Sequence, residues 1–240
     1  MKAGAQSVSS AAEGIESGKI NSEANLDRVV DKATRADIDR RWLVTDVATW
    51  YPVSEEPQRH FTDAMTAYAK KDYAGAAVDI RKATSYLRLE AGRATSEGKQ
   101  ALVSSITRLD SLADIVEKGA LKDEHAMTTA FAEANHSLAL EHRAKAAQSW
   151  MHKEYDEAGY ELEAAADGLE SAATWVGAEA KAGASATAAE TLALGGKLAS
   201  GAIWTRDAVA KGFKSLGNGI NALGRKIGGT KTVAPIKIGS

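Results

Sequence analysis

The chain has 240 residues, 44% of them hydrophobic and 26% charged, which is enough to bury a core and too ordinary for a collagen-like, low-complexity or disordered protein. It contains no cysteine, which excludes a disulfide scaffold, a thiolate metal cluster and a cysteine nucleophile. The net charge of −2 averages two unlike parts, because residues 196–240 carry eight Lys or Arg and one acidic residue, leaving 22 basic and 31 acidic residues before them. We therefore expect the basic C-terminal part to meet an anionic partner, which the acidic body of the same chain can provide.

Proline occurs only at Pro52, Pro57 and Pro235, and the long stretch between the last two is rich in Ala, Glu, Lys and Leu. No strand-like alternation interrupts this stretch, so the sequence predicts an all-α fold. Apolar residues at helical spacing predict helices over residues 26–51, 57–70, 73–91, 102–119, 122–152, 155–176, 184–200 and 203–227.

A shift of 82 positions aligns one half of this helical stretch with the other, without a gap, over roughly 75 residues. Tyr73 then falls on Tyr155, and Phe131 falls on Phe213. We interpret the match as an internal duplication, with chance similarity between alanine-rich amphipathic helices as the alternative, and we expect the paired tyrosines at equivalent corners and both phenylalanines in the core. The predicted organisation is an elongated helical bundle or short helical-repeat array. Its parts are a flexible N-terminus (1–20), capping helices (21–72), copy 1 (73–152), copy 2 (153–228) and a flexible C-terminus (229–240).

Each copy opens with a short motif, Tyr73-x-x-Ala76-x-x-x-Ile80-x-x-Ala83 in the first and Tyr155-x-x-Ala158-x-x-x-Leu162-x-x-Ala165 in the second. The motif resembles the second-helix half of a tetratricopeptide repeat, which implies helical hairpins and, at the level of the family, protein-partner binding. The chain departs from that family in two ways. Arg88 and Glu170 stand where the helix-ending proline would fall, and the 82-residue period is more than twice the family's.

Glu133 and His136 are three positions apart, a spacing that puts a carboxylate and an imidazole on one helix face as in carboxylate-bridged metal proteins. The second copy has Ser215 and Asn218 at these positions, so the repeat cannot supply a symmetric pair. We expect ordinary polar side chains here, with a metal site as the alternative. No catalytic nucleophile motif or phosphate-binding loop occurs, so we assign no catalytic residue and no cofactor.

The two copies differ in charge on their first helix. Arg81 and Arg88 occupy the positions that hold Glu163 and Glu170 in the second copy, and a spacing of seven puts each pair on one face. We predict that these four residues form interaction surfaces, together with Lys211 and Lys214 of the basic C-terminal helix. The stretch 154–170 holds seven acids and no base, which makes it a candidate seat for that helix.

The helix predicted at 203–227 carries a continuous apolar seam beside several cations. Two interpretations follow. The seam packs on the chain's own acidic body, or it lies on an anionic membrane surface, as basic amphipathic helices with aromatic residues do.

The sequence favours a non-enzymatic helical scaffold or adaptor that binds a protein partner or itself. The alternatives are a helical-bundle metal or cofactor protein and a peripheral membrane protein anchored by residues 203–227. Nucleic-acid binding is not expected, since the body is acidic and the basic part lacks interleaved aromatic residues. No apolar run is long enough to cross a membrane, and no export signal follows Met1, so we expect a soluble protein, or an exported one if a signal peptide was removed before Met1.

Overall fold

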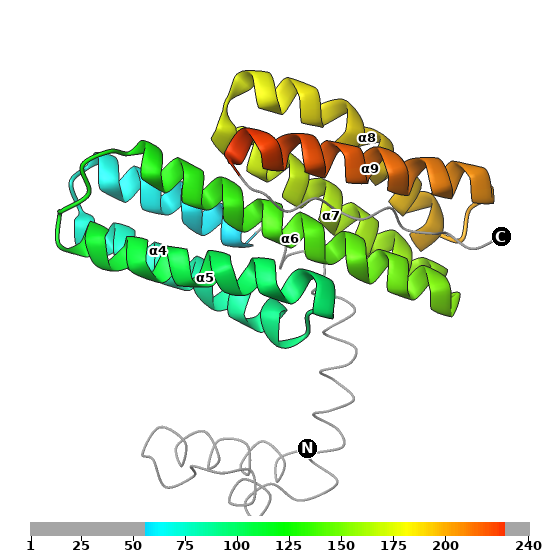
Figure 1. Cartoon of the computed structure of the whole chain (residues 1–240), viewed down its shortest axis with the longest axis horizontal. Helices are drawn as coiled ribbons and strands as arrows, with labels where there is room; N and C mark the ends of the chain where they lie inside the picture. The colour runs from blue at the N-terminus through cyan, green and yellow to red at the C-terminus, as the bar shows by residue number, and fades with distance from the viewer. Residues whose placement is uncertain (1–55, 229–240) are drawn as a thin grey trace, which may run out of the picture. The chain divides into compact units, whose positions relative to one another are not determined.

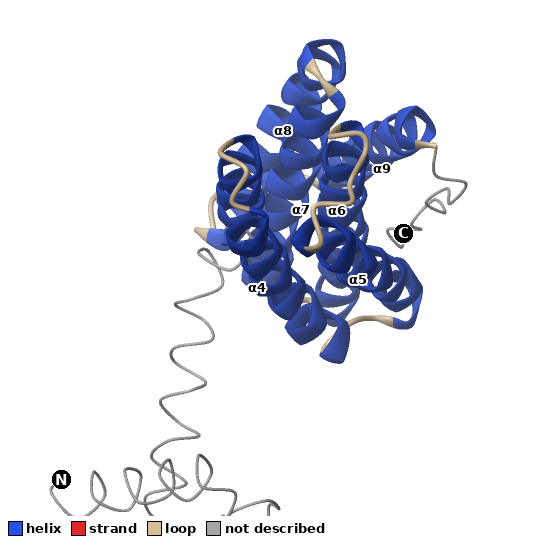
Figure 2. Cartoon of the chain, turned by 90° about the vertical axis from the view of Figure 1, so that its left-hand side faces the viewer, coloured by secondary structure: helices blue, strands red, loops and turns tan. Residues whose placement is uncertain are grey.

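A computed structural model of the chain describes residues 56–228. Within that range the chain forms seven helical segments and no strand, which confirms the all-α class (Figures 1 and 2). The segments are residues 56–69, α4 (Tyr73–Gly92), α5 (Ser96–Glu117), α6 (His125–His152), α7 (Tyr155–Val176), α8 (Ala178–Ala199) and α9 (Arg206–Ile227). The predicted helix at 26–51 and the predicted flexible ends lie outside the described residues.

Side-chain caps fix where three of these helices begin. Asp72 accepts a hydrogen bond from the Gly75 amide, Thr95 from that of Gly98 and Thr205 from that of Ala208. Each cap satisfies one of the amide donors that have no partner within the first helical turn. Two helices begin six residues earlier than predicted: α5 begins at Ser96 rather than at residue 102, and α8 begins before the predicted residue 184. α8 begins at Ala178, directly after Gly177, whose φ of 126° ends α7. The early turns of α8 bury only small residues, so the large apolar residues that reveal a helix in sequence are missing there.

Two apolar clusters make up the core, and α6 belongs to both. The first runs from Phe61 to Leu138 and joins residues 56–69, α4, α5 and the first half of α6. The second runs from Ala139 to Leu223 and joins the second half of α6 with α7, α8 and α9. Phe131 and Phe213 are 0% and 1% exposed, as expected. Of the predicted capping helices 21–72, Phe61 lies in the first cluster, and residues 21–55 lie outside the described residues.

Turns 82 residues apart share their local geometry. Lys71 and Lys153 are the two non-glycine residues of the described range with positive φ, at 62° and 67°. Gly119 and Gly201 follow the same pattern, at 61° and 67°. The ring of Tyr73 lies 5.4 Å from that of Tyr68 at 51°, and the ring of Tyr155 lies 4.9 Å from that of Trp150 at 52°. These pairs support the predicted duplication, which itself stays a prediction.

α9 packs on the helical body through its apolar seam. Val209, Phe213 and Ile220 are buried against the second cluster, as the core-packing interpretation predicts. The prediction that α9 docks on the acidic stretch 154–170 is only partly met. Lys226 Nζ of α9 pairs at 2.8 Å with Glu179 of α8, which lies outside that stretch. None of the described helices is long and apolar enough to cross a membrane.

Candidate functional site

The predicted interaction residues Arg81 and Arg88 form ion pairs within the chain. Arg81 Nη2 lies 2.9 Å from Asp114 and 2.7 Å from Glu117, while Arg88 Nη2 lies 2.6 Å from Asp110. Arg81 lowers the pKa of the Glu117 carboxyl, because it donates a hydrogen bond to that group and carries a positive charge. Both arginines link α4 to α5 on the surface, where solvent screens such pairs and they contribute little to stability.

The acidic counterparts in the second copy take different positions. Glu163 is 7% exposed, so it is buried within the chain and is not part of the open surface. It packs where α7 and α8 approach most closely: a Cβ at Gly195 would lie 2.6 Å from Glu163 Cγ and 2.7 Å from the Gly159 carbonyl oxygen. Glu170 accepts a long hydrogen bond from Ser185 Oγ at 3.4 Å. The remaining two predicted residues, Lys211 and Lys214, are exposed on α9.

Glu133 and His136 lie in a groove between α5, α6 and α9. Both α5 and α9 pack on α6, whereas no extended contact joins α5 to α9, and Figure 1 shows them on either side of α6. The groove has a volume of about 310 Å³, within the usual range for ligand sites. Its lining residues are Ala101, Ser104, Ser105 and Arg108 of α5, Glu133, His136, Ser137 and Leu140 of α6, and Gly224 and Ile227 of α9.

Two buried serines form part of the lining. Ser105 Oγ and Ser137 Oγ are 2.8 Å apart, and both side chains are 5% exposed. Ser137 Oγ donates to the Glu133 carbonyl oxygen at 2.9 Å, one helical turn earlier. These bonds fix both hydroxyl groups between α5 and α6 and satisfy groups that would otherwise be buried at a cost.

Glu133 faces a cation across the groove. Arg108 Nη1 donates to Glu133 Oε1 at 2.5 Å, which joins α5 to α6. Partial burial raises the pKa of Glu133 above its usual value, although Arg108 opposes the rise. The carboxyl group is thus held in a less polar setting than a surface glutamate.

His136 is fixed by α9. Its Nε2 lies 3.0 Å from the carbonyl oxygen of Ile220, and because a carbonyl can only accept, Nε2 carries the hydrogen. Burial lowers the pKa of His136, so the ring is neutral at pH 7. Glu133 and His136 therefore share a face as predicted, yet within residues 56–228 no group of three His, Cys, Asp or Glu side chains is placed to hold a metal ion.

A buried polar network at the middle of α6 was missed by the sequence analysis. Glu141 is fully buried and accepts from the Thr95 amide and from Thr95 Oγ1, both at 2.8 Å. Lys145 Nζ binds Glu90 Oε2 at 2.7 Å. The network ties α6 to the end of α4 and the start of α5, and the signal for it in the sequence was the polar residues on every face of α6.

His142 extends the buried polar groups of α6 toward α7. Its Nδ1 lies 2.7 Å from Glu161 Oε2, and both residues are buried. Burial alone would lower the pKa of His142, but the hydrogen bond and charge of Glu161, with the charge of Glu90, raise it overall. Burial also raises the pKa of the Glu161 carboxyl, against the influence of His142. When His142 is protonated and Glu161 is ionised, the pair joins α6 to α7 through a charge-assisted hydrogen bond.

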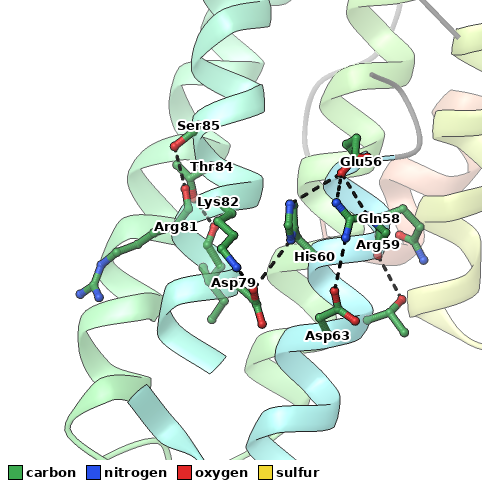
Figure 3. Close-up of polar contacts among 12 residues, drawn as sticks. Glu56, Gln58, Arg59, His60, Asp63, Asp79, Arg81, Lys82, Thr84 and Ser85 are labelled. Atoms are coloured by element: carbon green, nitrogen blue, oxygen red, sulfur yellow. Dashed lines mark hydrogen bonds and ion pairs between the residues drawn. The ribbon is translucent and has the colours of Figure 1, made fainter. Parts of the chain in front are cut away.

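The imidazole of His60 lies between two carboxylates at the N-terminal end of the described range (Figure 3). His60 Nε2 is 3.7 Å from Glu56 Oε2, its Nδ1 is 3.8 Å from Asp79 Oδ1, and its ring stacks on Tyr86 with centroids 5.9 Å apart. Lys82 Nζ also reaches Asp79, at 2.8 Å. This cluster links residues 56–69 to α4, and none of its residues lines the groove described above.

Comparison with known proteins adds no relative to this picture: no protein-family model, no curated protein and no solved structure matches the chain.

Proposed function

We propose that the protein is a non-enzymatic helical scaffold that binds a segment of a protein partner in the groove between α5, α6 and α9. The observation that carries the proposal is the groove itself, where α6 is left uncovered between two helices that both pack on it. Its lining combines apolar rims, such as Leu140 and Ile227, with fixed polar groups, the pattern that lets a site bury a side chain and orient it. The resemblance to tetratricopeptide hairpins agrees with partner binding.

Two of the residues proposed to contact the partner, Glu133 and His136, are the pair singled out by the metal-site alternative. Their contacts favour the scaffold, since Glu133 binds Arg108 and His136 binds a backbone carbonyl. For α9 to lie on a membrane surface instead, its apolar seam would have to leave the second cluster, where it is buried.

A display library of random twelve-residue peptides, selected on the full chain, tests the proposal. Ser104 is an exposed position on the rim, so Ser104→Trp fills the groove mouth without disturbing the core. Thr107→Trp is the matched control, because Thr107 is exposed on the same helix and does not line the groove. We expect enriched peptides to bind the wild type and the Thr107→Trp variant, and to lose at least tenfold in affinity for Ser104→Trp. Peptides that bind all three proteins equally, or no enrichment at all, would contradict a partner site in the groove.

A further inference from the structure

We infer that the groove between α5, α6 and α9 recognises a primary ammonium group on an alkyl stem, which on a protein partner is a lysine side chain. The inference rests on the proposed function, since it concerns the same groove, and it names the chemistry of the anchor. It follows from a count of the hydrogen-bond donors and acceptors that the lining leaves unused.

The buried hydroxyl groups have no hydrogen left to offer. Ser137 Oγ lies 2.9 Å from the carbonyl oxygen of Glu133, 3.3 Å from that of Ala101 and 2.8 Å from Ser105 Oγ, and it gives its single hydrogen to one of these acceptors. Ser105 Oγ, 2.8 Å from Ser137 Oγ, then gives its own hydrogen to Ser137 or to the Glu133 carbonyl at 3.4 Å. Each hydroxyl oxygen keeps lone pairs, so this part of the lining can only accept.

The imidazole of His136 adds a further acceptor. Its Nε2 hydrogen is donated to the Ile220 carbonyl oxygen, and the ring is neutral. In a neutral imidazole the second nitrogen, Nδ1, carries a lone pair and no hydrogen. His136 is only 8% exposed, which makes it a fixed part of the lining rather than a surface side chain.

The carboxylate of Glu133 supplies the charge. Arg108 occupies Oε1, and among the contacts of residues 56–228 this leaves Oε2 able to accept a further bond. Arg108 satisfies one oxygen of this partly desolvated carboxylate, and the second oxygen, with the neutral acceptors beside it, can take a further cationic donor. An ammonium group offers three donors and one positive charge, whereas a phosphate or carboxylate would bring further negative charge beside Glu133 and would have to compete with Glu133 for Arg108.

Apolar residues beside these acceptors suit the stem of the ligand. Ala101, Leu140 and Ile227 line the same groove and can cover methylene groups. Lysine buries its carbon stem along apolar surface while its ammonium reaches a polar partner. The groove therefore combines the two requirements of a lysine side chain.

Arg108 is the internal competitor for the carboxylate. Its side chain is 47% exposed, so it can leave Glu133 for solvent when another cation arrives. Removing the guanidinium should strengthen binding of an ammonium ligand, and removing the carboxylate charge should weaken it. These opposite signs separate a specific site from a general loss of structure.

The test is an NMR titration of the ¹⁵N-labelled full chain with lysine amide blocked at its α-amino group, with norleucine amide blocked in the same way as the uncharged analogue. We expect saturable shifts of the Ser104, Ser105 and Glu133 amides with the lysine probe, and at least tenfold weaker binding of the norleucine probe. Glu133→Gln should lower the affinity for the lysine probe at least fivefold. Arg108→Gln should raise it at least twofold, while Arg81→Gln, which removes an arginine from the distant α4–α5 pair, should leave it unchanged.

Equal binding of both probes, or tighter binding by Glu133→Gln, would overturn the inference. Its failure is distinguishable from failure of the scaffold function: library peptides that bind the groove but carry no lysine would refute the ammonium anchor and leave the scaffold standing.

Discussion

At the scale of single residues, Phe131 shows how one side chain holds three segments together. Its ring stacks on Phe61 of residues 56–69 with centroids 4.3 Å apart, and Trp175 of α7 meets its edge at 5.2 Å. The side chain is fully buried, so every contact lies within the packed interior. Such a residue determines how α6 sits between both clusters.

We expect Phe131→Ala to lower the free energy of unfolding by about 3–5 kcal/mol, since it removes buried apolar surface and leaves a cavity. Urea denaturation followed by circular dichroism measures the change. Ser111→Ala, at an exposed position of α5, is the control and should shift the free energy by less than about 0.5 kcal/mol. An unchanged midpoint for Phe131→Ala would show that the ring is not part of the core.

His142 predicts a pH dependence of stability. Its pKa is raised in the folded chain, so its contribution is fully present below the ordinary histidine pKa of 6.5 and is lost as pH rises through the folded value. The difference in unfolding free energy between wild type and His142→Gln should therefore be larger at pH 5.5 than at pH 9. An NMR titration should place the His142 pKa above 6.5, and a value below 6.5 would contradict the assigned pairing with Glu161.

At the scale of elements, α7 and α8 depend on glycines to come close. A Cβ at Gly159 would lie 2.5 Å from the Ala199 amide nitrogen and 2.6 Å from the Gly195 carbonyl oxygen, distances that real Cβ atoms do not reach. Backbone atoms cannot step aside as the end of a side chain can. The two helices are thus packed at a separation that only glycine permits at these positions.

Two substitutions in α8 should have opposite effects. Gly195→Ala places a methyl group against the Gly159 carbonyl oxygen and should destabilise the chain by roughly 1–3 kcal/mol. Gly183→Ala meets nothing within 4 Å and should stabilise it by about 0.5–1 kcal/mol, because alanine is the better helix former. Thermal unfolding of both variants gives the comparison, and the same sign for both would show that close packing is not the reason for Gly195.

At the scale of the whole molecule, the all-α class and most helix bounds could be predicted because large apolar residues recur at helical spacing. The start of α8 could not, since Ala180 and Ala184 carry little signal. The seven-residue spacing of Glu163 and Glu170 indicated which face they share, but only the approach of α8 determines whether that face is covered. The groove could be predicted only as the pair Glu133 and His136, because its remaining lining residues, apart from Ser137 and Leu140 of α6, come from α5 and α9.

The paired turns supply a test of the predicted duplication. Lys71 and Lys153 both adopt a left-handed backbone conformation, which is unfavourable for any residue that carries a Cβ. Lys71→Gly and Lys153→Gly should each stabilise the chain by a similar amount, about 0.5–1 kcal/mol, whereas Lys70→Gly should not. Calorimetry of the three variants decides the matter. Effects of opposite sign at the two positions would mean that the turns are not equivalent.

The sharing of α6 has a consequence for how this chain could be divided or rearranged. Tandem modules are ordinarily separable, because a cut in the linker between them leaves each with a complete interior. Here the boundary between the two clusters falls between Leu138 and Ala139, inside an unbroken helix. A cut there would leave each piece with a truncated α6. A cut at either end of α6 would leave one piece without the α6 residues that complete its apolar cluster. A gene fragment encoding either half alone would therefore specify an incomplete interior.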